Sequence, residues 1–334
     1  MVAWYRSYLI PFGLALIAFL IITTGGWIRI SDAGESCPDW PKCFGTWGFD
    51  ISEEQQAEWW EENPDEIDSR GAQHRYTTDQ IFTEWIHRAL VGVIGVFVVY
   101  SHYTAWSLRE KIGSRTYRVH YVSSVFLVLQ AILGYVTVDL DNAPWTVSLH
   151  LFMALMFTTS LIAVGLFWWQ GQEGLPTNLK IKNDNEMQNI ISLVMILLLI
   201  QLLIGAYLST SYHRGACGVG TTGGPLCSGT VIPSFEFGVL LQLGHRSSAL
   251  FIGGFLVWAR LKMKNETIIK AFNIALGFFG LNMALGGIYI LSASDGEFPG
   301  WISLVHLLVG VLTFLSIATA YLLCIANKEK IPND

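Results

Sequence analysis

Charged residues are scarce in this chain of 334 residues. Asp, Glu, Lys and Arg make up 14% of it, against about 25% in a typical soluble domain, while apolar residues make up 52%. This shortage of charge excludes an ordinary soluble domain. We expect the chain to lie in a lipid bilayer and to have no nucleic acid as a partner.

Long uncharged runs take the place of the missing charges. Eight stretches are long enough to cross a bilayer core of about 30 Å. In lipid only helices or closed barrels satisfy the backbone polar groups, and barrel strands alternate in polarity over about ten residues. The sequence therefore predicts an all-α membrane protein with eight transmembrane helices, at about 9–28, 81–105, 119–138, 145–169, 189–209, 237–259, 270–292 and 301–325.

Positive charges indicate the direction in which these helices cross the membrane. Lys and Arg are concentrated in alternate connections, most densely at 109–118 and 260–264. Because cytoplasmic loops carry the excess of Lys and Arg, we predict a multi-pass protein of the cell membrane with both termini cytoplasmic. The acidic stretch 51–70 then lies in the first outer loop, as a solvated or partly helical surface.

Cysteine is also rare, and four of the five cysteines form two close pairs. Cys37 and Cys43 bracket "PDWPK", and Cys217 and Cys227 bracket "GVGTTGGPL". Both pairs fall in predicted outer loops, where an oxidising compartment permits a disulfide within each loop. Metal binding is the alternative, but no histidine stands at finger-like spacing beside either pair, so disulfides are favoured.

The chain repeats itself. "HR" at 87–88 returns at 245–246, and "WTVSLHLFMAL" returns as "WISLVHLLVGVL". "LQAILGYV", "LNMALGGIY" and the related "IQLLIGAY" each place an amide four residues before a glycine. Four helices separate corresponding points, so the copies share one orientation in the membrane. We predict two pseudo-symmetric four-helix bundles in parallel repeat: an N-terminal domain 1–170, a cytoplasmic linker 171–188 and a C-terminal domain 189–334.

Four histidines lie at matched positions in this repeat. His87, His150, His245 and His306 each follow the outer boundary of their helix by a few residues, which places them roughly 8–12 Å deep. Polar residues are costly at that depth and indicate function. Two imidazoles facing each other inside a four-helix bundle suit axial ligation of heme iron. Zinc or copper would want further ligands, which the C-terminal half does not offer at that depth.

Arg88 and Arg246 each follow one of these histidines. Guanidinium groups can snorkel toward the outer face and clasp heme propionates there. Ordinary anchoring at the membrane interface is an equally good interpretation of both residues.

One difference separates the two copies. Glu84 stands three residues before His87, on the same helix face, and Gln242 holds the corresponding position before His245. Two sites that only carried electrons would need no carboxylate. The asymmetry therefore predicts chemistry in the first site, where Glu84 can accept a proton or stabilise a developing positive charge. The alternative is a glutamate that is simply hydrogen-bonded at the interface.

Together these motifs resemble heme A synthase. The resemblance covers nearly the whole chain, and "EWIHR", "GHR", the two Trp-x4-His openings, "TTGGWIRISDAG" and the two cysteine pairs carry it. The family has eight transmembrane helices in two similar halves. The acidic insertion after Cys43 departs from the family pattern.

The resemblance implies an enzyme that oxidises the C8 methyl group of heme O to a formyl group, through a hydroxymethyl intermediate, to give heme A for terminal oxidases. It implies that heme O binds between His87 and His150, with Glu84 as the catalytic carboxylate. It further implies a resident heme b between His245 and His306. Heme O synthase (the protoheme farnesyltransferase) and cytochrome oxidase assembly factors are the protein partners it suggests.

Two other functions are compatible with parts of the pattern. A di-heme b-type cytochrome that carries electrons from a quinol would use the same four histidines, and many quinone sites also hold a carboxylate. A transporter would share the parallel repeat, but no helix has the mid-span Gly or Pro break of a central substrate site.

Overall fold

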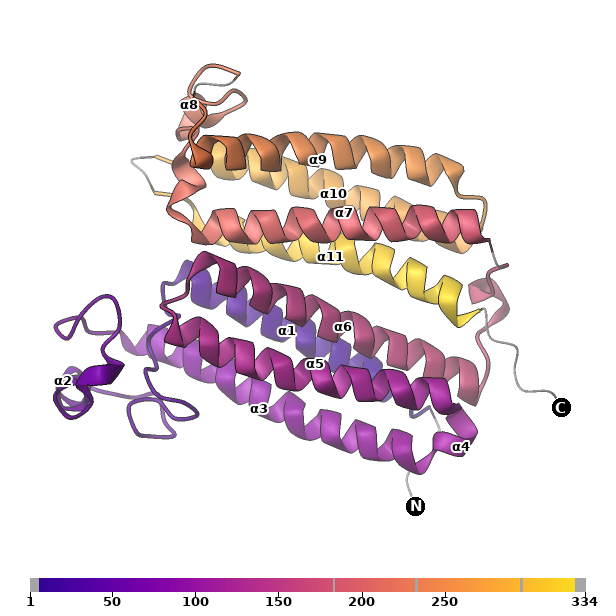
Figure 1. Ribbon diagram of the computed structural model, residues 1–334, viewed down its shortest axis with the longest axis horizontal. Coiled ribbons are helices and arrows are strands. Elements are labelled where there is room, and N and C mark those ends of the chain that lie inside the picture. Colours follow the sequence, from indigo (N-terminus) through magenta and orange to yellow (C-terminus); the bar gives the residue numbers. More distant parts are fainter. Residues whose placement is uncertain (1–5, 183, 232–233, 295–296, 328–334) are drawn as a thin grey trace.

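The protein is all α-helical in a computed structural model that describes residues 6–182, 184–231, 234–294 and 297–327. The ends of the two predicted domains, residue 183 of the predicted linker and short pieces of two loops lie outside the described residues. Eight long helices run roughly parallel within the described residues (Figure 1): α1 (Leu9–Ile30), α3 (Thr78–Ser107), α5 (Ser114–Asp139), α6 (Pro144–Gln172), α7 (Asn185–Thr210), α9 (Phe237–Lys262), α10 (Glu266–Leu291) and α11 (Gly300–Ala326).

Short helices occupy the connections. They are α2 (Glu53–Glu62), α4 (Arg109–Ile112) and α8 (Gly220–Gly223), with the 3-10 helices η1 (Pro64–Glu66), η2 (Thr177–Leu179) and η3 (Tyr212–Gly215). Helix α2 lies in the acidic stretch, which is therefore partly helical, as predicted. Ser52 caps it by accepting from the backbone N–H of Gln55, whose side chain accepts from the Ser52 N–H in return.

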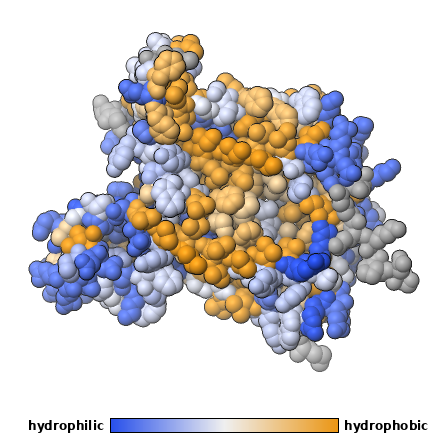
Figure 2. Space-filling view, viewed as in Figure 1, coloured by the Kyte–Doolittle hydropathy of each residue, from blue (hydrophilic) through white to orange (hydrophobic). Residues whose placement is uncertain are grey.

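Seven of the long helices are apolar and long enough to cross a membrane, and α9 falls outside that set. Figure 2 shows hydrophobic residues over the middle of the helices and hydrophilic residues toward both ends. Helix α9 is as long as its neighbours, but its first half carries the polar residues Gln242, His245, Arg246, Ser247 and Ser248. These residues lower its mean hydropathy. The structure thus shows a multi-pass membrane protein with seven candidate spans.

The helices lie in two neighbouring groups (Figure 1). Helices α1, α3, α5 and α6 pack together, as do α7, α9, α10 and α11, and contacts of α6 with α7 and α11 join the groups. One hydrophobic core spans the junction. It contains, among others, Leu155 of α6, Leu198 of α7 and Phe314 of α11, each at most 3% exposed. Because lipid tails are as apolar as these side chains, close van der Waals packing across the junction holds the groups together.

The two loops that contain the cysteine pairs lie at one end of the helices. The loop with α2 and the loop with α8 both project from that end, while α4 lies at the opposite end, where α1 begins and α11 ends (Figure 1). Each loop contains one disulfide, Cys37–Cys43 in the first and Cys217–Cys227 in the second, which confirms the predicted pairing.

Candidate functional site

The four predicted histidines come from four long helices and form two pairs. His87 on α3 lies within electrostatic range of His150 on α6, and His245 on α9 lies within electrostatic range of His306 on α11. All four are partly buried. The structure therefore brings together the residues that the sequence pairs, one pair in each group of helices.

Each imidazole packs against a glycine of a neighbouring helix. A Cβ atom added at Gly25, Gly134, Gly205 or Gly286 would lie 2.9–3.3 Å from Cε1 of His87, His150, His245 or His306, respectively. Any side chain at these positions would crowd or push the ring. This contact explains the three glycines that follow an amide by four residues in the sequence, and Gly25 of "TTGGW" supplies the fourth.

The same helices hold the ring nitrogens. The Thr24 hydroxyl donates to the Ile21 carbonyl, so its oxygen is left to accept from Nδ1 of His87 at 2.8 Å. Nδ1 of His306 donates to the Asn282 carbonyl at 2.9 Å. In a neutral ring this leaves Nε2 unprotonated, which is the form that binds a metal, and a hydrogen bond to the other nitrogen is the usual support of a metal-ligating histidine.

The other member of each pair contacts an amide. Nε2 of Gln130 lies 3.1 Å from Nε2 of His150, and Nε2 of Gln201 lies 3.1 Å from Nδ1 of His245. Nδ1 of His150 is buried with no hydrogen-bond partner among the described residues. An amide N–H that donates to one ring nitrogen leaves the proton on the other, so these two histidines take the iron-binding form when the amides turn their oxygens toward the rings. Nδ1 of His150 and Nε2 of His245 are then the nitrogens that can bind an iron.

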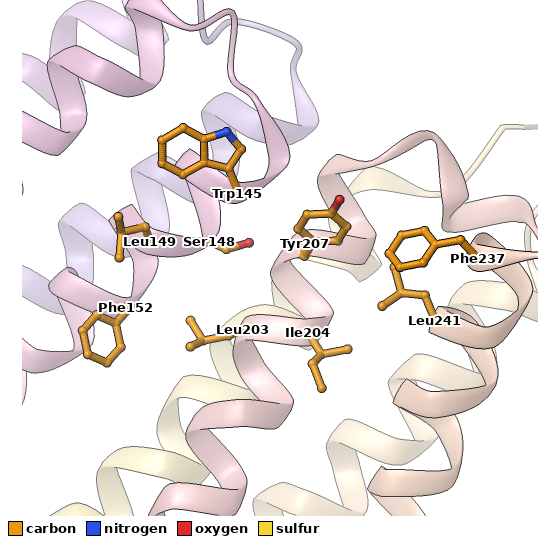
Figure 3. A pocket seen from close by; sticks show the side chains of 9 residues that line it. All are labelled: Trp145, Ser148, Leu149, Phe152, Leu203, Ile204, Tyr207, Phe237 and Leu241. Carbon is orange, nitrogen blue, oxygen red and sulfur yellow. The ribbon is translucent and has the colours of Figure 1, made fainter.

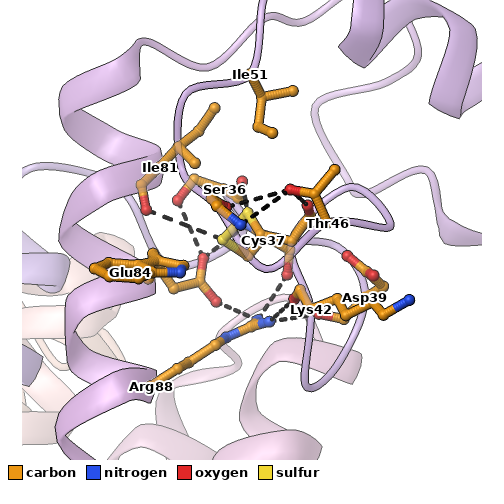
Figure 4. The surroundings of a disulfide bond; sticks show 12 residues. Ser36, Cys37, Asp39, Lys42, Thr46, Ile51, Ile81, Glu84 and Arg88 are labelled. Atoms are coloured by element: carbon orange, nitrogen blue, oxygen red, sulfur yellow. Dashed lines mark hydrogen bonds and ion pairs between the residues drawn. A yellow bond between two sulfur atoms is a disulfide. The ribbon is translucent and has the colours of Figure 1, made fainter.

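Glu84 stands three residues before His87 on α3, and its side chain reaches the disulfide loop (Figure 4). It is 3% exposed. Its Oε2 accepts from the backbone N–H of Cys37 at 2.9 Å and from the Ser36 hydroxyl at 3.1 Å. Its Oε1 forms an ion pair with Arg88, one turn further along α3. The carboxylate thus sits at the boundary between helix and loop, where all three contacts are hydrogen-bond donors.

Gln242 occupies the corresponding place on α9, but it donates hydrogen bonds where Glu84 accepts them. It is equally buried, at 3% exposure, and its amide nitrogen donates to the carbonyls of His213 and Arg214. Arg246 donates to the Gly223 carbonyl at 2.7 Å, and its Nη2 is buried without a hydrogen-bond partner among the described residues. The second loop thus presents acceptors to Gln242, whereas the first loop presents donors to Glu84.

A separate cavity of about 560 Å³ opens between the two groups of helices (Figure 3). None of the four histidines lines it. Its walls are almost entirely apolar, with the hydroxyls of Ser148 and Tyr207 and the Trp145 indole as the polar groups nearby, so it suits an apolar chain better than a charged group. Its lining comes from α6, α7 and α9: Trp145, Ser148, Leu149, Phe152, Leu203, Ile204, Tyr207, Phe237 and Leu241.

Comparison with known proteins identifies the chain's relatives. A sequence profile of the COX15-CtaA family, described as cytochrome oxidase assembly protein, matches residues 8–318. The chain belongs to this family. It is 26% identical to the heme A synthase of Shewanella oneidensis, over 81% of this chain and 83% of that protein. It is 25% identical to the heme A synthase of Geobacillus thermodenitrificans, over 90% of this chain and 87% of the relative.

The family match confirms the resemblance drawn from the sequence motifs. The heme A synthase of Wolbachia pipientis wMel is 25% identical over 94% of this chain and 91% of its own length. All four histidines and Glu84 fall inside the region that the family profile matches. The site residues that the sequence did not single out are Ser36 and Thr24, because neither stands at a spacing that indicates a contact with α3.

Proposed function

We propose that this protein is a heme A synthase, which oxidises the C8 methyl group of heme O to a formyl group. The family match over residues 8–318 supports the reaction class. The observation that carries the proposal is the asymmetry of the two sites: a buried Glu84 beside the pair His87–His150, and a buried Gln242 beside His245–His306. An acid beside one site alone fits one reacting heme and one that is not altered.

The first site would take heme O as substrate. His87 and His150 would hold its iron from either side, with the ring of His87 oriented by Thr24 and that of His150 by Gln130. Glu84 would act on the substrate by accepting a proton or by stabilising positive charge that develops on the macrocycle.

The second site would hold heme b as a resident cofactor. His306 fits the group, because its Nδ1 donates to the Asn282 carbonyl and leaves Nε2 free to bind iron. His245 fits it when the Gln201 amide presents its oxygen to Nδ1. When bound there, heme b supplies an iron that passes single electrons. Gln242 provides no ionisable group, which suits a site that performs no proton chemistry.

Arg88 and Arg246 are our candidates for contacts with heme propionates. The unpartnered Nη2 of Arg246 favours that role for the second site. Arg88 already donates to Glu84 and to the carbonyls of Cys37, Asp39 and Lys42, so it would reach a propionate only by exchanging one of these partners.

We further propose that α9 is the eighth transmembrane helix and that the halves form two pseudo-symmetric bundles, 1–170 and 189–334, joined by the linker 171–188. The packing of α9 beside α7 and α10 supports this arrangement. The distribution of Lys and Arg supports cytoplasmic termini. Heme O synthase, as the source of the substrate, and cytochrome oxidase assembly factors are the partners we propose.

The test is to express the protein with a source of heme O and to separate the extracted hemes by chromatography. Heme A together with heme b is the expected result. Heme b alone, at two per chain, would overturn the proposal in favour of a di-heme cytochrome that carries electrons from a quinol.

A further inference from the structure

The disulfide loop Cys37–Cys43 and helix α3 are joined by an unusually dense set of polar contacts around Glu84. Cys37 contributes to both sides of this junction: its N–H donates to Oε2 of Glu84 at 2.9 Å, and its carbonyl accepts from Arg88 at 2.6 Å. Ser36 adds a second donor to Oε2 at 3.1 Å. The loop therefore contacts the carboxylate through adjacent residues, one of which is half of the disulfide.

Arg88 closes the junction from the helix side. Its two terminal nitrogens donate to Glu84 and to three loop carbonyls, those of Cys37, Asp39 and Lys42 (Figure 4). A planar guanidinium can bind several acceptors at fixed angles, which a lysine cannot do. Cys43 bonds covalently to Cys37, so the disulfide closes the segment that supplies these three carbonyls.

The second half shows that this junction is not a general requirement of the fold. There Arg246 has one loop carbonyl as its hydrogen-bond partner among the described residues, that of Gly223, and Gln242 carries no charge with which it could pair. Gln242 bonds to the carbonyls of His213 and Arg214, which lie before the disulfide Cys217–Cys227 and outside it. Helix α9 is thus attached to its loop without an arginine that contacts both an acid and a disulfide-closed segment, as Arg88 does on α3.

We propose that Arg88 is a positioning residue that fixes the Glu84 carboxylate against the disulfide-closed loop, so that the loop and α3 together set the direction of the acid. This inference rests on the proposed function of Glu84 and deepens it. Three donors hold the two carboxylate oxygens, as expected for an ionised acid, which accepts hydrogen bonds only. The Ser36 hydroxyl lies within reach of the Ala33 and Gln80 carbonyls as well as Glu84. Its single proton can therefore turn away when Glu84 takes up a proton.

The experiment measures the reactivity of Glu84 with dicyclohexylcarbodiimide, which modifies accessible protonated carboxyl groups in membrane proteins. The full-length protein with its resident heme is labelled at neutral pH, and the modified peptide is quantified by mass spectrometry. Arg88→Gln should raise the labelling of Glu84 about tenfold, the factor that corresponds to losing one charge-assisted hydrogen bond. Arg88→Lys should restore protection only in part, because an ammonium group cannot span four acceptors.

Arg260→Gln is the control, since Arg260 donates to Asn273 at the far end of α9 and its loss should leave the labelling of Glu84 unchanged. If Arg88→Gln fails to retain the absorption spectrum of the resident heme, Ser36→Ala provides a milder variant that removes one donor to Oε2. Labelling of Glu84 at the wild-type rate in both Arg88→Gln and Ser36→Ala would overturn the proposal.

A second readout separates positioning from simple stability. Reducing the disulfide Cys37–Cys43 should raise the labelling of Glu84 in the wild type, and it should raise it less in Arg88→Gln, where the loop contacts the acid through Ser36 and Cys37 alone. Equal increases in the two proteins would contradict the coupling. Should the wild type make no heme A from heme O, the proposed function would fail, whereas the labelling pattern would still report whether Arg88 positions Glu84.

Discussion

At the scale of single residues, Glu84 and Gln242 differ by one polar group, an oxygen in place of an NH2. That group faces donors in the first half, where Ser36, Cys37 and Arg88 converge on it. It faces carbonyls in the second half. Each side chain therefore matches the hydrogen-bonding groups around it. Replacing Glu84 by Gln would bring an NH2 group among donors, and replacing Gln242 by Glu would bring an oxygen among acceptors.

Glu84→Gln should lower heme A formation by at least about a hundredfold, the usual contribution of a positioned acid or base. The amide cannot accept a proton near neutral pH. The heme spectrum of the second site should persist, because Gln242 and its histidines are untouched. Chromatography of extracted hemes and absorption spectroscopy measure the two effects, and a parallel loss of both hemes would show that Glu84 is structural.

Gln242→Glu is the reciprocal variant. It places a carboxylate against the carbonyls of His213 and Arg214, which can donate nothing to it. Burying that carboxylate without a donor should cost more than the roughly 1–3 kcal/mol of an unsatisfied neutral group. Weakened retention of heme b without any gain of heme A activity is the expected outcome.

Gly205→Ala should disturb His245. The new Cβ would lie 2.9 Å from Cε1 of the ring, and overpacking of this kind costs about 1–3 kcal/mol. We expect a lower heme content and a shifted Soret band in the purified protein. Gly254→Ala is the control, since a Cβ at that position meets no atom within 4 Å; equal effects of the two variants would mean that the glycine does not serve the histidine.

At the scale of elements, the sequence predicts the helices well. The stretch predicted at 81–105 becomes Thr78–Ser107, and that at 189–209 becomes Asn185–Thr210. The additional residues lie outside the apolar run because polar caps start these helices: Thr77 accepts from the Gln80 N–H, and Asp184 from the Met187 N–H. The hydropathy pattern predicts only the apolar part of each helix, and the capped polar turn extends the helix beyond it.

The polar contacts of the loops were less predictable. The pairing of the histidines follows from the repeat, and the disulfides follow from spacing within each loop. The contacts of Glu84 with Ser36 and Cys37 join residues 47 and 48 positions apart, and no periodicity of the sequence indicates them. They depend on the folded path of the loop, which backbone geometry determines and composition does not.

Glu35 gives the first loop a dependence on pH. It is buried, it accepts from Asn142 at 2.9 Å and it lies 3.5 Å from Arg70. Burial raises the pKa of Glu35 above its ordinary 4.5, against the opposing effects of Asn142 and Arg70. The folded state then binds the proton more tightly than the unfolded chain does, so this residue's contribution to stability falls as pH rises from 4.5 through the raised pKa.

Glu35→Gln removes this dependence. The thermal midpoint of the variant should therefore improve relative to wild type as pH rises through that window, as measured by unfolding in detergent at a series of pH values. Glu54→Gln should show a small trend of the opposite sign, because hydrogen bonds to its own backbone and to Ser52 lower the pKa of the exposed Glu54. A Glu35→Gln difference that does not vary with pH would contradict the assignment.

At the scale of the whole molecule, the two groups of helices share one core. Leu155, Leu198 and Phe314 come from three helices in both groups and belong to a single hydrophobic cluster. The connection between α6 and α7 takes part in the same core, because Leu175 and Ile181 are buried in it and Leu179 packs against it. This connection and the contacts between α6, α7 and α11 therefore fix the relative positions of the two sites.

A chain divided after Gly174 should reassemble. Gly174 has a positive φ of 77° and no atom within 4 Å of its Cβ position, so a break there falls at an uncrowded point of the connection between α6 and α7. The two fragments, when expressed together, should purify as a complex with bound heme. Either fragment alone should aggregate, because it exposes half of the shared core. A soluble, heme-loaded fragment on its own would show that the halves are independent.

The polar first half of α9 bears on how the chain is made. Insertion scales assign an arginine near the middle of a span a cost of about 2.5–3.5 kcal/mol, and Arg246 stands beside further polar residues in that helix. During synthesis, α9 on its own should therefore pass inefficiently from the translocation channel into lipid. We expect it to be released into lipid only together with α10 and α11, so that biogenesis of the second half proceeds as one late, concerted event at the ribosome.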